Sequence, residues 1–257
     1  MIIPIPLSRR GAQWLGRLWQ EIHEDSLEKG RTTWDWRVLV VLGVVTLSLS
    51  LQEFCGSSRD LFKLWPHLRE GRWGELNGYI WWSGWRVFGL LVMPVIAVLC
   101  MPGERLRDYG WSFKGFFKHL WLYVLLYILV LPFVYWVSHW DSFQRIYPFY
   151  KLANRSPADL WAWELMYAAQ FLSLEFFFRG FMLHATKRVL GIHSVWVMCI
   201  PYCMIHYGKT FAESMGAVVA GLVLGTVSLR TKSIWGGVFI HIAVAVTMDL
   251  FCLKYIR

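Results

Sequence analysis

Residues 157–185 read PADLWAWELMYAAQFLSLEFFFRGFMLHA. The stretch is long enough to cross a bilayer, because a spanning helix needs about 20 residues. It nevertheless contains Glu175 and Arg179, although a bare charge near the bilayer centre costs at least ~2.5–3.5 kcal/mol. A helix places residues four apart on one face, where the two charges can pair. We therefore predict a membrane helix, capped by Ser156 with Pro157 in its first turn, whose ion pair either locks helix packing or serves a function.

The composition of the whole chain also indicates a membrane protein. Of 257 residues, 56% are hydrophobic and only 17% are charged, which is too apolar for an ordinary soluble domain. The 17 tryptophans suit a protein with two membrane interfaces. The net charge of +9 comes from Lys and Arg that lie mostly between apolar runs, where they attract anionic lipid. We expect a lipid bilayer as the environment and no nucleic-acid partner.

Seven apolar runs follow one another along the chain. Their approximate ranges are 34–53, 79–101, 116–140, 157–185, 194–206, 213–230 and 233–253. Several approach the length of a spanning helix. They predict an all-α, polytopic membrane helix bundle of about seven to eight transmembrane helices, formed by a single domain over residues 34–257. A small excess of basic residues on the N-terminal side favours a cytoplasmic N-terminus.

The first 33 residues have a different pattern. They lack the uninterrupted apolar core and small-residue cleavage site of a signal peptide. Apolar residues recur at helical spacing opposite polar ones: Trp14, Leu15, Leu18, Trp19 and Ile22 against Arg17, Gln20, Glu21 and Glu24. We predict an amphipathic segment over residues 1–33 that lies on the membrane surface. A helix packed on a neighbouring loop is the alternative.

The five cysteines do not indicate a disulfide framework, because four lie in apolar runs and their number is odd. Cys199 and Cys203 share one helix face, but no further cluster has the spacing of a zinc site. We interpret them as small core residues and expect neither a metal nor another cofactor.

The residues suited to chemistry concentrate in the C-terminal half. Glu175, His206 and His241 lie on three separate predicted helices and can converge in the core of a bundle, where helical proteins build their sites. An intramembrane histidine can also be a simple interhelical hydrogen-bond donor. Lys209 and Glu213 are four residues apart and can form a salt bridge at a helix entry. Three ionisable positions in consecutive apolar segments favour a shared site.

The order of these motifs resembles a known family. EFFFRG, then an aromatic residue four positions before His206, then GK…E and finally RTKSIWGGVFIHIAVAVTMD are similar to the CPBP family of CAAX prenyl endopeptidase and bacteriocin-processing (Abi-type) intramembrane proteases. The resemblance covers about residues 163–250. It implies a bundle of about eight helices that hydrolyses peptide bonds at the membrane. In this family a glutamate and a histidine activate water, and a second histidine with an asparagine stabilises the oxyanion.

The chain departs from the family motifs at three positions. Glu175 matches the second glutamate of E-E-x-x-x-R, while Leu174 stands at the position of the first, which the family uses as the principal base. This single glutamate is similar to a branch that reads W-E-F-F-F-R-G. Tyr202 stands where F-x-x-x-H has phenylalanine, and Ala245 stands where the last motif has asparagine. Moving a carboxylate by one residue turns it by about 100° around the helix.

The sequence therefore predicts an intramembrane endopeptidase that acts on a membrane-anchored peptide or protein. Glu175 and His206 are expected to activate water, and His241 to polarise the scissile carbonyl. The supporting candidates are Arg179, which holds the carboxylate, Tyr202, and the two carboxylates that can substitute for the base, Glu213 and Asp249. A zinc-dependent version would use a Glu/His/His site, but no H-E-x-x-H helix supports it, and the family resemblance implies metal-free catalysis. We expect a multi-pass protein of the bacterial inner (plasma) membrane.

Two alternatives from other classes remain open at this point. A catalytically silent relative would keep the polar site to bind a membrane-anchored peptide or a partner protein. A transporter would use the same Glu, Arg and His residues as a proton relay.

Overall fold

The computed structural model of the protein describes residues 16–17, 20–21 and 35–253. The amphipathic segment predicted for residues 1–33 therefore lies almost wholly outside the described residues. Among these residues the chain is helical and contains no strand.

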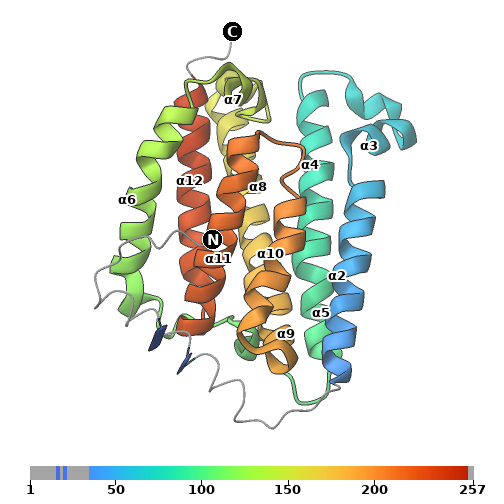
Figure 1. Cartoon of the computed structure of the whole chain (residues 1–257). Coiled ribbons are helices and arrows are strands. Elements are labelled where there is room, and N and C mark those ends of the chain that lie inside the picture. Colours follow the sequence, from blue (N-terminus) through green and yellow to red (C-terminus); the bar gives the residue numbers. More distant parts are fainter. Residues whose placement is uncertain (1–15, 18–19, 22–34, 254–257) are drawn as a thin grey trace.

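The α-helices form one bundle (Figure 1). They are α2 (Trp36–Cys55), α3 (Ser58–Leu64), α4 (Gly74–Val87), α5 (Met93–Cys100), α6 (Leu120–Val137), α7 (Asp141–Ile146), α8 (Pro157–Glu175), α9 (Leu183–Leu190), α10 (Ser194–Met204), α11 (Phe211–Thr231) and α12 (Trp235–Leu253). Short 3-10 turns are η1 (Pro66–Arg69), η3 (Leu106–Tyr109), η4 (Phe117–His119), η5 (Ala153–Arg155) and η7 (Gly191–His193). Two π-helical turns, η2 (Phe88–Val92) and η6 (Phe176–Met182), continue α4 and α8 without a break.

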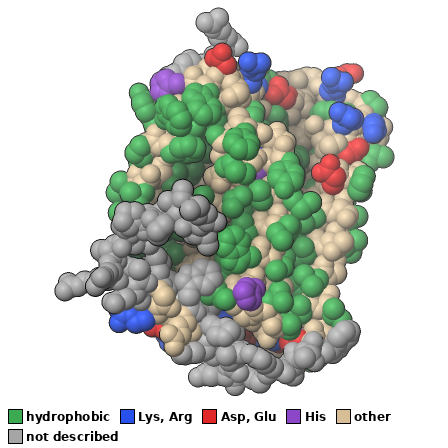
Figure 2. Space-filling model, in the orientation of Figure 1, with side chains coloured by type: hydrophobic (Ala, Val, Ile, Leu, Met, Phe, Trp, Pro, Cys, Tyr) green, Lys and Arg blue, Asp and Glu red, His purple; other side chains and the backbone are tan. Residues whose placement is uncertain are grey.

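Five helices are long and apolar enough to cross a membrane, which confirms the predicted membrane bundle. They cover Trp36–Cys55, Gly74–Cys100, Phe117–Val137, Phe211–Thr231 and Trp235–Leu253. Large hydrophobic side chains point outward along them, and Figure 2 shows these side chains over the middle of the visible face, with most charged groups nearer its two ends. A surface of this kind suits contact with lipid.

The run that contains the charge pair forms α8, η6 and α9 in one continuous path. The side chain of Ser156 accepts a hydrogen bond from the backbone N–H of Asp159, and Pro157 occupies the first turn, as predicted. The helix α8 lies between α4 and α12 and makes extensive contacts with both. This position brings the middle of α8 close to the last helix of the chain.

The other π-helical turn, η2, ends just before Pro94. Proline lacks an N–H and its ring crowds the carbonyl one turn earlier, so helices commonly adjust at this point. The hydroxyl of Ser48 donates to the freed carbonyl of Gly89, at 2.7 Å. The two π-helical turns contact each other in the core of the bundle.

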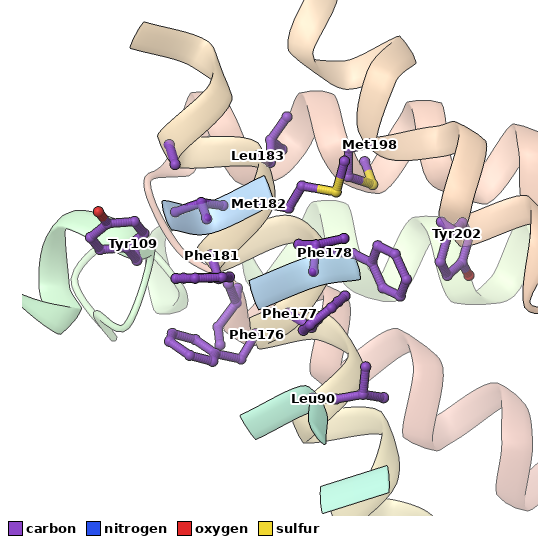
Figure 3. Close-up of a cluster of buried hydrophobic side chains, with 14 of the residues drawn as sticks. Leu90, Tyr109, Phe176, Phe177, Phe178, Phe181, Met182, Leu183, Met198 and Tyr202 are labelled. Atoms are coloured by element: carbon purple, nitrogen blue, oxygen red, sulfur yellow. The ribbon is translucent and has the colours of Figure 1, made fainter. Parts of the chain in front are cut away.

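Aromatic residues of η6 fill the centre of the bundle. Phe176, Phe177, Phe178 and Phe181 are fully buried (Figure 3). They belong to one large core cluster with residues of α2, α5, α10, α11 and α12. The polar groups of this segment are therefore held in a closely packed and apolar surrounding.

A cluster of charged groups joins three elements at the lower end of the bundle in Figure 1. Glu104 lies in the connection after α5, and its carboxylate accepts hydrogen bonds from Arg188 on α9 and from the hydroxyl of Tyr109, the latter at 2.9 Å. Arg37 at the start of α2 is 2.9 Å from the same carboxylate. Burial raises the pKa of the Glu104 carboxyl, but the hydrogen bonds and charges of its partners outweigh burial, so the pKa lies below its ordinary value.

We expect Glu104→Gln to lower the free energy of unfolding by about 1–3 kcal/mol at neutral pH, because Arg37 and Arg188 lose their shared anion. A depressed folded pKa stabilises the protein above the unfolded value of about 4.3, and this contribution is lost as the pH falls through the folded value. Wild type and variant should therefore converge in stability below about pH 4. Denaturant unfolding in detergent across pH measures this, with the exposed Glu70→Gln as control. Equal stability at neutral pH would contradict the role of the cluster.

Candidate active site

Glu175 is the last residue of α8, directly before the π-helical turn. Its side chain is fully buried. Leu174, by contrast, packs against the large apolar core cluster. A π-helical turn holds one residue more than an α turn and changes the direction of the side chains around it, and such turns are frequent at functional sites. The single glutamate of the EFFFRG motif therefore points into the polar centre, while its apolar neighbour Leu174 joins the core.

The carboxylate of Glu175 contacts His241 on α12. Its Oε1 atom lies 2.6 Å from Nδ1 of His241, which is 66 residues away in the sequence. The histidine ring stacks on Phe171, with ring centroids 5.4 Å apart and planes 13° apart. Phe171 is one helical turn before Glu175, so α8 holds His241 by both a ring and a charge.

Arg179 lies beside the same carboxylate. One guanidinium nitrogen is 3.2 Å from Oε1 of Glu175, and both side chains are almost completely inaccessible to solvent. This distance gives an ion pair, but the guanidinium N–H groups make no well-directed hydrogen bond to any described residue. The guanidinium carbon instead lies 3.8 Å from the ring centroid of Tyr202, as in a cation–π contact. The predicted pairing of Arg179 with Glu175 is therefore present.

Tyr202 on α10 completes a chain of polar contacts. Its hydroxyl lies 3.0 Å from Nε2 of His241. Both ring nitrogens of His241 are thus engaged, one with Glu175 and the other with Tyr202. Figure 3 shows Tyr202 with its ring facing Phe178, at a centroid distance of 5.3 Å.

His206 lies in the turn after α10, beyond the helix end at Met204. Its Nδ1–H donates to the carbonyl oxygen of Tyr202 at 2.8 Å, and its ring meets the Tyr202 ring edge-on at 4.9 Å. The structure therefore brings Glu175 and His241 into direct contact. His206 does not join this contact directly; it lies beside Tyr202, which in turn contacts His241.

The two candidate substitute bases have other partners. Glu213, at the start of α11, lies 2.5 Å from both Lys209 and the Tyr147 hydroxyl, which is the helix-entry salt bridge considered from the sequence. Asp249, two turns beyond His241 on α12, accepts from the indole N–H of Trp163 at 2.6 Å. In the described contacts neither carboxylate meets Glu175.

Ala245 stands where the last family motif has asparagine, so this position has no polar group. Its methyl group is buried in a cluster with Trp163 and Tyr167. This side of the site therefore has an apolar lining where the family motif has an amide. Among the described residues, no group of three or more His, Cys, Asp or Glu side chains is arranged to hold a metal ion.

Gly237 is a site residue that the sequence analysis did not identify. It lies one turn before His241, and a Cβ atom built there would overlap Oε2 of Glu175. Oε2 is buried and has no hydrogen-bond partner among the described residues. Gly237 and Phe171 each lie four residues before a predicted site residue, a helical spacing that identifies them as neighbours on the same face.

If Glu175 is the base expected from the sequence, Gly237→Ala should lower kcat by about 100-fold, because displacing a catalytic group by about 1 Å can cost that much. The protein should still fold, since the overlap is with the end of a flexible side chain. Cleavage assays and thermal unfolding in detergent measure the two effects. Gly216→Ala on α11 is the matched control, because a Cβ atom there meets nothing within 4 Å. A fully active Gly237→Ala protein would show that the carboxylate does not need this space.

Residues 156–247 match the family model described as type II CAAX prenyl endopeptidase Rce1-like. The matched segment contains the whole chain of contacts from Glu175 to His241. The match confirms the family resemblance that the motifs predicted. The comparisons with curated proteins and with solved structures found no match.

Proposed function

We propose that this integral membrane protein is an endopeptidase that hydrolyses a peptide bond of a membrane-anchored protein. The match to a family of CAAX prenyl endopeptidases supports the class of reaction. The observation that carries the proposal is the state of the Glu175 carboxylate. It is buried, Oε1 is held by His241 at 2.6 Å and by Arg179 at 3.2 Å, and Oε2 has no partner among the described residues.

A carboxylate held by one oxygen can act as a general base with the other. Water within about 2.6–3.2 Å of Oε2 would lose a proton to it while the water oxygen attacks the carbonyl carbon of the substrate. The tetrahedral intermediate then collapses as the C–N bond breaks. Glu175 returns the proton to the leaving nitrogen, so the carboxylate is regenerated at the end of the cycle.

The two histidines receive different roles in this proposal. His241 donates Nδ1–H to Glu175 and so orients the base. For His241 to polarise the scissile carbonyl, as the sequence analysis expected, Nε2 must release Tyr202 and also gain a proton, because the neutral ring that donates Nδ1–H to Glu175 has only an acceptor at Nε2. We assign to His206 the task of assisting Glu175 with the water, since its Nδ1–H is fixed to the backbone and its other nitrogen is left for this purpose.

The substrate is expected to approach from the side of His241. The side chain of His241 keeps 14% of its surface exposed, whereas Glu175 keeps 1%. A site enclosed by helices with an apolar outer surface suits a peptide that is itself anchored in the membrane. This placement supports a membrane-anchored protein as the partner of the site.

Two observations favour the alternative of a silent relative that binds a peptide without cleaving it. Arg179 and His241 both stabilise the negative charge of Glu175, and a stabilised carboxylate is a weaker base. Leu174, at the position of the family's principal base, packs into the apolar core. In this alternative, Oε2 of Glu175 is too weak a base to take a proton from water.

The decisive experiment uses purified protein in liposomes with a set of membrane-anchored peptides and identifies products by mass spectrometry. We expect cleavage by the wild type, with and without a chelator, and none by Glu175→Gln. Loss of cleavage with chelator and its return with added metal would show that cleavage needs a metal ion, which contradicts the metal-free mechanism. Binding of a peptide that is never cleaved, lost in His206→Ala and His241→Ala, would establish the silent relative.

A further inference from the structure

The ring of Tyr202 is held rigidly in the core. The residue is 1% exposed, its face lies 3.8 Å from the guanidinium carbon of Arg179, and Phe178 meets it edge-on. Figure 3 shows Phe178 beside Tyr202 in this cluster. A phenylalanine at position 202 would make the same ring contacts. The hydroxyl group is therefore the part of this side chain that the packing does not require.

The hydroxyl has a defined hydrogen-bond role. A carboxylate can only accept, so the 2.6 Å contact between Glu175 and His241 requires a proton on Nδ1. In a neutral imidazole the other nitrogen, Nε2, is then an acceptor. With the ring in this neutral form, the hydroxyl of Tyr202, 3.0 Å from Nε2, is the donor in that bond. The two hydrogen bonds therefore run in one direction: Tyr202 donates to His241, and His241 donates to Glu175.

We propose that Tyr202 is a positioning residue, whose hydroxyl holds Nε2 of His241 so that Nδ1–H remains directed at Oε1 of Glu175 and Oε2 remains available to water. The inference rests on the proposed peptidase function. It concerns the Tyr202 hydroxyl, which is absent from the phenylalanine of the F-x-x-x-H motif and is not required for packing.

Tyr202→Phe removes this donor and retains the ring. If Tyr202 positions His241, kcat should fall by about tenfold, since one such hydrogen bond contributes about that factor, while KM is unchanged. Tyr207→Phe removes a hydroxyl from the exposed residue five positions along and should leave both constants unchanged. A change in KM alone would assign the hydroxyl to substrate binding and overturn the proposal.

Nitrogen NMR of histidine-labelled protein in liposomes tests the same contact without any substrate. The signals of His241 are assigned by their loss in His241→Gln. In wild type we expect a protonated Nδ1 and an unprotonated, hydrogen-bonded Nε2. In Tyr202→Phe the Nε2 signal should move downfield as it loses its donor, while Nδ1 stays protonated. An unchanged Nε2 signal would overturn the proposal even if the wild type cleaves peptides. A shifted signal would support the contact even if no peptide is cleaved, which separates this inference from the proposed function.

Discussion

Replacing Glu175 with glutamine should lower kcat by about 100-fold to 10,000-fold, the usual contribution of a general base. Glutamine has nearly the same shape, and its carbonyl oxygen can still accept Nδ1–H of His241. It cannot take a proton from water, so chemistry should be lost. The shape of the side chain is retained, but the buried Arg179 loses its anion, so the variant should also be less stable than wild type. Single-turnover cleavage of a membrane-anchored peptide measures the rate, and thermal unfolding in detergent measures the fold.

The structure offers two matched controls for this variant. Glu213→Gln and Asp249→Asn neutralise other carboxylates in the same bundle, each held by partners away from Glu175. Both variants should retain most of the wild-type kcat. If Glu175→Gln cleaves normally and one of these does not, the base has been assigned to the wrong residue.

A double variant shows whether Glu175 and His206 act on one water molecule. His206→Ala should lower kcat severely, and Glu175→Gln combined with His206→Ala should be little worse than either alone, because groups that act as a unit are not additive. Independent, multiplying losses would mean that His206 serves a different step.

Replacing Arg179 with alanine should have the largest effect on stability. Arg179 and Glu175 form a buried ion pair at 3.2 Å, and removing one partner of a buried pair costs about 3–5 kcal/mol, because the other charge is left uncompensated. The variant also loses the guanidinium that lies against the Tyr202 ring. Folded yield after solubilisation and the denaturant midpoint in detergent should both fall.

An exposed ion pair supplies the comparison for Arg179. Arg230 pairs with Glu21 at 2.6 Å, but more than half of each side chain is exposed. Surface pairs contribute about 0–1 kcal/mol, so Arg230→Ala should be close to wild type. If Arg179→Ala is as stable and active as Arg230→Ala, then Arg179 neither stabilises the bundle nor holds the carboxylate.

The membrane helices could be predicted from the sequence because the signal for them is local. Hydrophobicity over about 20 residues determines whether a helix can span, and five of the seven predicted runs agree with the five spanning helices among the described residues. The runs at 157–185 and 194–206 are not among these five. The start of α8 was also predictable, since Ser156 and Pro157 have local capping roles. The end of α10 was not. The predicted run reached His206, but the helix ends at Met204, after Pro201 has removed one backbone donor.

The sequence indicated the members of the candidate site but not their contacts. Spacing placed Glu175 and Arg179 on one face, and the motifs indicated that His206 and His241 belong with them. Which histidine nitrogen meets the carboxylate depends on how α8 and α12 pack, over 66 residues of intervening chain. The π-helical turn and the space left by Gly237 arise from that packing. Side-chain chemistry alone does not encode them.

The π-helical turn η6 also determines which changes in length this segment can tolerate. The turn accommodates one residue more than an α-helix would, while α8 and α9 continue on either side. Deleting one residue from 176–182 would restore α-helical geometry and turn Glu175 by about 100° relative to α9. Exchanges among large apolar residues would preserve the core, whereas a deletion would take the carboxylate away from His241. The position of the carboxylate therefore depends on the number of residues in this run as well as on the identity of Arg179.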